Sequence, residues 1–558
     1  MPGDELAGKR HQARSDGTGA DPRTEGKETA GDARAGGRLA RLAARPGARW
    51  LAIFSLSLGL LAVRFLVPGP VGQADNRDGP RLMCGRGLGL VPVVPHGAPR
   101  YFRYAYFEYL PSPSCASLRT YPSSEVVPLE LARLLTPVLR LPGTLNLIAV
   151  GLVLSVAASV GIASLATGLR LRLWAQLAVA GAGWLIMADA AFFDVDAGPF
   201  SDPAALIGLL LVAAGVLYLG RGWRATLRGL ALAGPGGLLA ILSKEQYLIL
   251  AVPICLTLVL ASADREAGRE GLADGARRAR SWLRRFRTRQ TGAAVAVASL
   301  LAAAAGGYWL WDDTSRFARH LHQEQAVNMI FEDIVNGHDR AAADLRALGL
   351  PVSWAKYAGD YYWKNVSVRT DPLYARYQGQ LTDGNIARFL VTHPGRMISI
   401  AQQAAMFAQQ YRITSLGDYP PSAGHPPGAV ESRVAVVSWL MHRLPARLGL
   451  LWLLPLWAAM AAVAAVALTR RRGESWHRDA AAWVLCMTGC AVVAFIPPAL
   501  FDGISTTRHM VGMNLATALA FAVSGALAVS TIRHLVARPG RRRETRAASA
   551  VPELAKPG

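Results

Sequence analysis

Apolar runs long enough to cross a bilayer dominate this 558-residue chain and limit what it can fold into. Eight runs reach the roughly 17 residues that a membrane helix needs: 51–67, 143–167, 173–193, 203–219, 291–311, 447–468, 480–500 and 510–532. A ninth stretch, 229–262, is apolar on both sides of a Ser-Lys-Glu-Gln segment at 243–246. In lipid the backbone must satisfy its own polar groups, so such runs fold as helices. The sequence therefore predicts an all-α polytopic membrane protein.

The positions of the arginines set the expected orientation of these helices. Segment 264–290 alone holds nine Arg, and basic connections stay in the cytoplasm. If 229–262 crossed the bilayer as one span, this segment would lie outside. If 229–262 folds back as a hairpin with its tip at 243–246 on the outer face, the segment lies inside. The charge pattern therefore predicts the hairpin, about ten membrane segments and two cytoplasmic termini.

The same pattern divides the chain into five parts. They are a disordered basic cytoplasmic tail (1–49), an N-terminal membrane bundle (50–311) with an acidic outer loop (68–142), an extracytoplasmic helical domain (312–446), C-terminal membrane helices (447–532) and a basic cytoplasmic tail (533–558). Within the extracytoplasmic domain, apolar residues at helical spacing predict a helix from Ser315 to Val335. A second helical stretch, 383–412, opens after Thr382 and is interrupted by Pro394.

The net charge of +22 does not indicate a nucleic-acid-binding protein. Most of the arginines lie in short connections between apolar runs or in the tails, and no basic stripe interleaved with aromatic residues appears. No P-loop is present, which excludes ATP-driven transport of that class. The partner that the composition does predict is the lipid bilayer itself.

The five cysteines give a redox expectation but no metal site. Cys84 and Cys115 lie in the same predicted outer loop, where a disulfide can persist, and the sequence leaves the bonded and the free states equally open. Cys255, Cys486 and Cys490 fall in apolar runs and are interpreted as small core residues. No metal-ligand spacing appears, so we expect no cofactor, although the sequence does not decide whether a divalent metal takes part.

The charge pattern places most membrane-proximal carboxylates, including Asp194 and Asp202, at the outer face, and Arg64 at the end of the first span can snorkel to it. Charged residues at this predicted outer face are the candidate functional residues. The first group follows the first span, the second is at the hairpin tip and the third precedes the last helix: Asp75, Asp78 and Arg81; Lys244 and Gln246; Asp502, Arg508 and His509. A lysine in a membrane hairpin costs about 3 kcal/mol unless it pairs or binds an anion. An ion pair of Lys244 with Glu245, interfacial snorkelling of Arg508, and a simple salt bridge of Arg81 are the structural alternatives.

Several short motifs occur in the order found in one family of membrane enzymes. They are Asp75-Asn76-Arg77-Asp78-Gly79-Pro80-Arg81-Leu82-Met83, Phe200-Ser201-Asp202-Pro203-Ala204, Ser243-Lys244-Glu245-Gln246, Val327-Asn328-Met329-Ile330-Phe331 with Leu348-Gly349-Leu350-Pro351, Leu416-Gly417-Asp418-Tyr419, and Asp502-Gly503 with Arg508-His509. Together they resemble the integral-membrane hexose transferases of surface-glycan assembly (the WsfD type), part of the wider GT-C class of glycosyltransferases. The resemblance covers about residues 50 to 530.

The resemblance implies a GT-C fold and transfer of a hexose from a polyprenyl-phosphate carrier to a cell-surface or cell-wall glycan. Asp78 is then expected to be the general base, with Asp75 orienting the acceptor or sharing the proton. Lys244, Arg508 and Arg81 would stabilise the phosphate. Gln246, Asp502 and His509 would complete the substrate site.

Two other functions remain open at this stage. A transporter or flippase of glycolipids would also gather charge at a membrane face, but it should show internal repeats and charges along a path. The sequence contains no evident repeat. A non-catalytic membrane component of envelope glycan assembly is the second alternative.

Overall fold

The computed structural model describes residues 46–73, 79–91, 104–113, 115, 122–196, 198–219, 221–263, 294, 297–307, 317–336, 340–412, 416–469, 475–503 and 506–536. The chain divides into two compact units, Met1–Leu51 and Ala52–Gly558. The second unit holds the helical bundle and the helical domain that the sequence predicts to lie outside the membrane, which is called the outer domain below.

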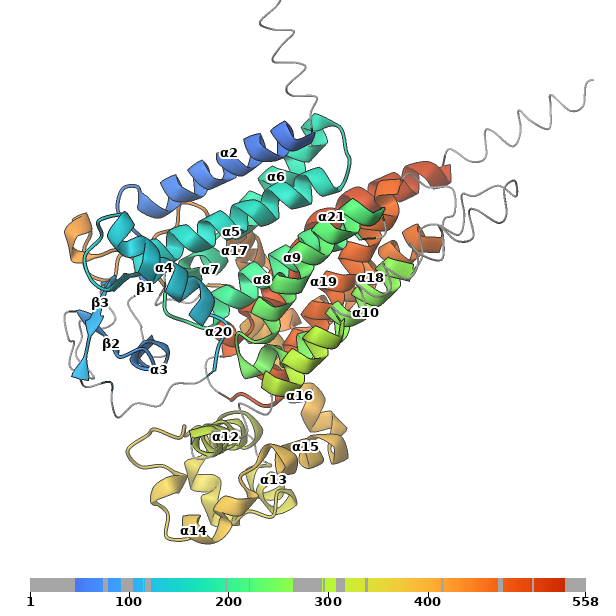
Figure 1. Ribbon diagram of the computed structural model, residues 1–558. Helices are drawn as coiled ribbons and strands as arrows, with labels where there is room; N and C mark the ends of the chain where they lie inside the picture. The colour runs from blue at the N-terminus through green and yellow to red at the C-terminus, as the bar shows by residue number, and fades with distance from the viewer. Residues whose placement is uncertain are drawn as a thin grey trace, which may run out of the picture. The chain divides into compact units, whose positions relative to one another are not determined.

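Each of the nine predicted apolar runs contains a helix. These are α2 (Pro46–Leu66), α5 (Leu147–Gly168), α6 (Leu173–Met187) with α7 (Ala190–Asp196), α8 (Asp202–Val216), α9 (Trp223–Ile241) with α10 (Ala251–Ala263), the helix Val297–Gly307, α18 (Leu450–Thr469), α19 (Ser475–Leu500) and α21 (Val511–Val536). Long helices run alongside one another in the bundle of Figure 1.

The described residues contain fewer full-length spans than the ten expected. Five helices are long and apolar enough to cross a membrane, or six if α6 and α7 form one span with a 67° bend. The helices Asp202–Val216, Glu245–Leu260 and Val297–Gly307 are apolar but shorter. The chain is therefore a mostly helical, multi-pass membrane protein with about five or six candidate spans.

The predicted break inside 229–262 is present. Helix α9 ends at Ile241, and the 3₁₀-helix η3 (Glu245–Leu250) leads into α10. Helix α9 packs closely on α8 because glycines meet at their contact. A Cβ atom added to Gly208 would lie 2.5 Å from the carbonyl oxygen of Gly236. Small residues at a helix contact let two backbones approach, as is common in membrane bundles.

The outer domain is a group of short helices around its own apolar core. They are α12 (Phe317–Asn328), the π-helical turn η4 (Met329–Ile334), α13 (Ala341–Ala347), η5 (Val352–Tyr357), η6 (Val368–Thr370), α14 (Tyr374–Tyr377), η7 (Gln378–Gln380), α15 (Asp383–Thr392) and α16 (Pro394–Ala408). Phe331, Trp354 and Phe389 are buried at the centre. As predicted, Thr382 caps α15 by accepting from the Asn385 amide at 3.3 Å, and Pro394 begins the next helix.

The expectation of an all-α protein is wrong, because the described residues also form five short strands. β2 (Leu88–Val91), β3 (Glu108–Pro111) and β4 (Leu145–Asn146) form an antiparallel sheet in the order β2-β3-β4. β1 (Gly72–Gln73) pairs antiparallel with β5 (Leu416–Asp418). Each strand has two to four residues, which is too short for an alternating pattern to be recognised in the sequence.

Within its described residues, the predicted outer loop between the first two long helices also holds two helices and a disulfide. These helices are α3 (Gly79–Cys84) and α4 (Val126–Val138). Cys84 and Cys115 are bonded to each other, so the first of the two open states is the one found. Cys255, Cys486 and Cys490 are free and buried, as predicted. The remaining described elements are η8 (Pro421–Ala423), α17 (Val436–Arg443), η9 (Ala446–Leu448) and α20 (Thr506–His509).

Two adjacent carboxyl groups make the stability of the outer domain depend on pH. Burial raises the pKa of Glu332 from 4.5 to about 7. Burial, followed by the neighbouring charge of Glu332, raises the pKa of Asp333 from 3.8 to about 7. Between these values the folded state binds more protons than the unfolded state, so the free energy of unfolding falls as pH rises.

We therefore expect the thermal unfolding midpoint of the full-length protein in detergent to fall between about pH 4 and pH 7 and to change less above that interval. The double variant Glu332→Gln, Asp333→Asn should flatten this dependence, because neither side chain then titrates. An equally steep decline in the double variant would assign the effect to other groups.

Candidate functional site

A cavity of about 310 Å³ lies between the hairpin tip, α12, α15 and the end of α19. Five of the lining residues carry titratable side chains. The hairpin tip contributes Lys244 and Glu245, α12 contributes His322, α15 contributes Asp383, and the segment after α19 contributes Asp502. Gln246 and Gln325 add amide groups, while Leu248, Pro497 and Phe501 contribute an apolar wall. The volume is within the range of small-ligand sites, and the mixture of charge and apolar surface suits an amphipathic ligand.

The hairpin tip is joined to the start of the last helix through Gln246. Its Nε2 donates to the backbone carbonyl oxygen of His509 at 3.0 Å. The ring of His509 lies between Asp502, which contacts Nδ1, and Arg508, whose Nη2 lies 3.0 Å from Nε2. A guanidinium can only donate, so Nε2 accepts and Nδ1 carries the proton that it donates to Asp502. The structure thus brings together five of the eight residues that the sequence singled out, since Lys244 and Asp502 also line the cavity.

The Phe-Ser-Asp segment at the start of α8 (Phe200 to Asp202) contacts the same region. The hydroxyl of Tyr247 donates to Asp202 Oδ1 at 3.1 Å, and both residues are buried. Gly512 leaves room for the tyrosine ring, because a Cβ there would lie 2.6 Å from Tyr247 Cε1. The guanidinium of Arg508 lies 5.2 Å from the centroid of the Phe200 ring. Asp202, expected at the outer surface, is instead an interior residue.

The segment Asp502-Gly503, which follows α19, packs against the outer domain. A side chain at Gly503 would collide with the backbone of Asn328 and Met329, at the junction of α12 and η4. The side chain of Asn328 is buried, and its Oδ1 accepts from the Tyr362 amide at 2.7 Å. The cavity residue Asp502 is therefore held beside the outer domain by the backbone contact of the next residue.

The two carboxylates expected to carry the chemistry, Asp75 and Asp78, lie outside the described residues. Arg81, the third member of that group, is half-buried in α3 and is not among the residues that line the cavity. The structure therefore brings together the second and third groups of candidate residues, and Arg81 does not join them at the cavity.

Two cavity residues were missed in the sequence. His322 on α12 lies between two carboxylates: its Nδ1 is 3.0 Å from Asp383 Oδ2, and its Nε2 is 3.5 Å from Glu245 Oε1. In the sequence, His322 was part of a helix predicted from its apolar residues alone. Asp383 was noted only as the first residue after the predicted helix cap Thr382. Because the three residues come from distant parts of the chain, no local motif marks them.

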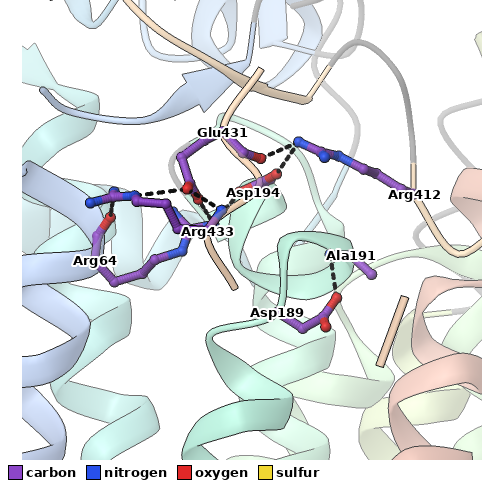
Figure 2. A network of polar contacts seen from close by, with 7 residues as sticks. All are labelled: Arg64, Asp189, Ala191, Asp194, Arg412, Glu431 and Arg433. Carbon is purple, nitrogen blue, oxygen red and sulfur yellow. Dashed lines mark hydrogen bonds and ion pairs between the residues drawn. The ribbon is translucent and has the colours of Figure 1, made fainter. Parts of the chain in front are cut away.

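A buried network of charged residues lies elsewhere in the second unit (Figure 2). Arg64 on α2 pairs with Asp194 of α7 at 3.0 Å and with Glu431. Arg412 reaches Asp194 at 3.6 Å, and Arg433 donates to Glu431 at 2.8 Å. The sequence predicts that Arg64 snorkels to the outer surface; this is wrong, because its side chain is 2 % exposed and bonded to acids from distant segments.

Within the part of the chain that the structure describes, no group of three or more His, Cys, Asp or Glu side chains is arranged to hold a metal ion. The charged cavity residues contact one another or other protein groups instead. This arrangement can bind charged and hydroxylated ligands. Its carboxylates and its histidine are groups that can transfer protons.

These features define a polytopic, helical integral membrane protein. Residues 41–547 match the family described as the YfdI N-terminal transmembrane domain. The match covers most of the chain, so the chain belongs to that family. No curated protein and no solved structure matches it.

Proposed function

We propose that this protein is a membrane glycosyltransferase that moves a hexose from a polyprenyl-phosphate carrier to a cell-surface or cell-wall glycan on the outer face. The observation that carries the proposal is the cavity, in which Lys244 and several carboxylates face an apolar wall. A sugar joined through phosphate to a polyprenyl chain offers the matching groups: hydroxyls, an anion and a hydrocarbon.

The proposed chemistry assigns separate tasks to cations and carboxylates. When the sugar leaves its carrier, negative charge remains on the phosphate, and Lys244 and Arg508 would stabilise it. Arg81, which does not line the cavity, is left out of this step. Asp78 would remove the proton from the acceptor hydroxyl, and Asp75 would orient that hydroxyl. Leu248, Pro497 and Phe501 would contact the first part of the lipid chain.

The proposal includes about ten membrane segments in a GT-C-type fold with both termini in the cytoplasm. Support comes from the helix found in each predicted apolar run and from the break before Glu245. The arginine-rich segment 264–290 belongs inside by the positive-inside rule, so the hairpin tip and the cavity face outward.

The test is transfer from a labelled, water-soluble short-chain polyprenyl-phosphate hexose to sealed membrane vesicles, without nucleotide sugar. Right-side-out vesicles containing the protein should incorporate label into polymer, whereas inverted vesicles should do so only after permeabilisation. Equal incorporation by vesicles that lack the protein would contradict the proposed activity. Movement of the intact labelled lipid across the membrane without transfer would identify a glycolipid transporter instead.

A further inference from the structure

The outer domain presents two aromatic side chains to solvent beside a charged cluster. In the segment 361–363, Tyr361 is 41 % exposed and Trp363 is 50 % exposed, while Tyr362 between them is buried. The buried ring packs edge-on against Trp363, with the ring centroids 5.1 Å apart. The segment therefore exposes two aromatic side chains on either side of a buried one.

Polar contacts hold Trp363 in one orientation. Its Nε1 donates to Glu324 Oε1 at 2.6 Å. The guanidinium of Arg369 lies 5.4 Å from the Trp363 ring centroid and 4.3 Å from that of Tyr362. A ring that is already held in place by neighbouring charged groups loses little conformational freedom when a ligand binds.

The aromatic segment is connected to the cavity through α12. Glu324, which holds Trp363, lies on this helix between His322 and Gln325, both of which line the cavity. Asn328 at the end of the same helix accepts from the Tyr362 amide at 2.7 Å. The exposed rings and the cavity thus share one rigid element.

We propose that Tyr361 and Trp363 form a subsite that binds the glycan acceptor; this inference rests on the proposed transferase function. The C–H face of a hexose can lie flat on an aromatic ring, while its hydroxyls bond to polar groups at the ring edge. Glu324 provides an acceptor at that edge, and Arg369, whose guanidinium lies over the Trp363 ring, provides a donor beside it. A chain held there would extend from the outer domain toward the cavity.

The contacts of Trp363 favour a sugar over lipid as the occupant. Interfacial tryptophans turn their N–H toward water and headgroups, whereas the N–H of Trp363 donates to a carboxylate of its own protein. A carboxylate at the ring edge would also be repelled by anionic lipid headgroups. Sugar hydroxyls, in contrast, bond well to an ionised carboxylate.

The experiment measures binding of neutral malto-, manno- and galacto-oligosaccharides to the full-length protein in nanodiscs without donor. We expect Trp363→Ala to weaken binding about tenfold or more, and Tyr361→Ala, which removes only an exposed ring, to weaken it as well. Trp439→Ala is the matched control: Trp439 is 57 % exposed and also carries a stacked arginine, Arg443, at 4.9 Å. It should bind as the unaltered protein does.

Three results would overturn the subsite. The first is transfer in which both Tyr361→Ala and Trp363→Ala keep the unaltered KM for the acceptor. The second is no binding of any of these oligosaccharides by the unaltered protein. The third is quenching of tryptophan fluorescence by brominated lipid that is smaller in Trp363→Phe than in the unaltered protein, which would place the ring in the bilayer. Oligosaccharide binding that depends on Trp363 in a protein without transfer activity would support the subsite and reject only the proposed catalysis.

Discussion

Asp78→Asn should lower the rate of hexose transfer by about 10²–10⁴-fold, the usual effect of losing a general base. The amide has nearly the shape of the carboxyl group but cannot take the acceptor proton, so expression and donor binding should stay unchanged. The residue directly precedes α3, whose last residue, Cys84, is bonded to Cys115. Initial rates at saturating donor, together with donor KM, measure the effect in membranes.

Lys244→Ala should give the opposite kinetic pattern, because the lysine is expected to contact the donor phosphate. It should raise donor KM more than it lowers the rate at saturation. Lys364→Ala is the matched control, since Lys364 lies in the outer domain with its side chain 51 % exposed and paired with Asp360.

For the general base, near-normal transfer by Asp78→Asn with transfer lost in Asp75→Asn would move the base three residues upstream. Unchanged transfer in both variants would refute the mechanism proposed here.

The helices could be predicted because length and hydropathy are local properties. Each apolar run contains a helix, and the arginines of 264–290 were enough to predict the break before Glu245. The bend between α6 and α7 was missed, although its signal is present: Asp189 precedes α7, and its Oδ1 accepts from the Ala191 amide at 3.0 Å. An aspartate before an apolar turn is a typical helix cap.

Pairings between distant segments could not be predicted from the same information. Asp194 and Asp202 were expected at the outer surface because acids are tolerated there, yet both are buried. Their partners, Arg64 and Tyr247, lie in other helices, and hydropathy carries no information about which residues meet.

The candidate site was accessible to sequence reasoning only where short motifs mark it. Gln246, Asp502 and His509 could be selected in this way, and they come together in the structure. His322 and Asp383 belong to no such motif, so only the folded chain reveals that they face Glu245.

Arg64→Met should lower the free energy of unfolding by about 3–5 kcal/mol, the usual cost of leaving buried charge without its partner. The side chain of Arg64 is 2 % exposed, and it forms ion pairs with both Asp194 and Glu431, whose side chains are fully buried. Methionine fills a similar volume but carries no charge, so the negative charges of Asp194 and Glu431 would lose the positive charge that Arg64 places beside them. Arg412 lies 3.6 Å from Asp194, too far for a close ion pair to replace Arg64.

Arg433→Met is the matched control, because Arg433 contacts the same Glu431 at 2.8 Å but is 41 % exposed. Water solvates the charges of an exposed ion pair, so we expect Arg433→Met to lower the free energy of unfolding by about 1 kcal/mol or less. Unfolding of the purified protein in mixed detergent micelles, followed by circular dichroism at several denaturant concentrations, compares the two variants under one condition. Equal losses in both would show that burial does not set the strength of this network. An unchanged stability in Arg64→Met would mean that the contacts of Arg64 in Figure 2 add nothing net to the fold, because the desolvation cost of a buried pair can offset its attraction completely.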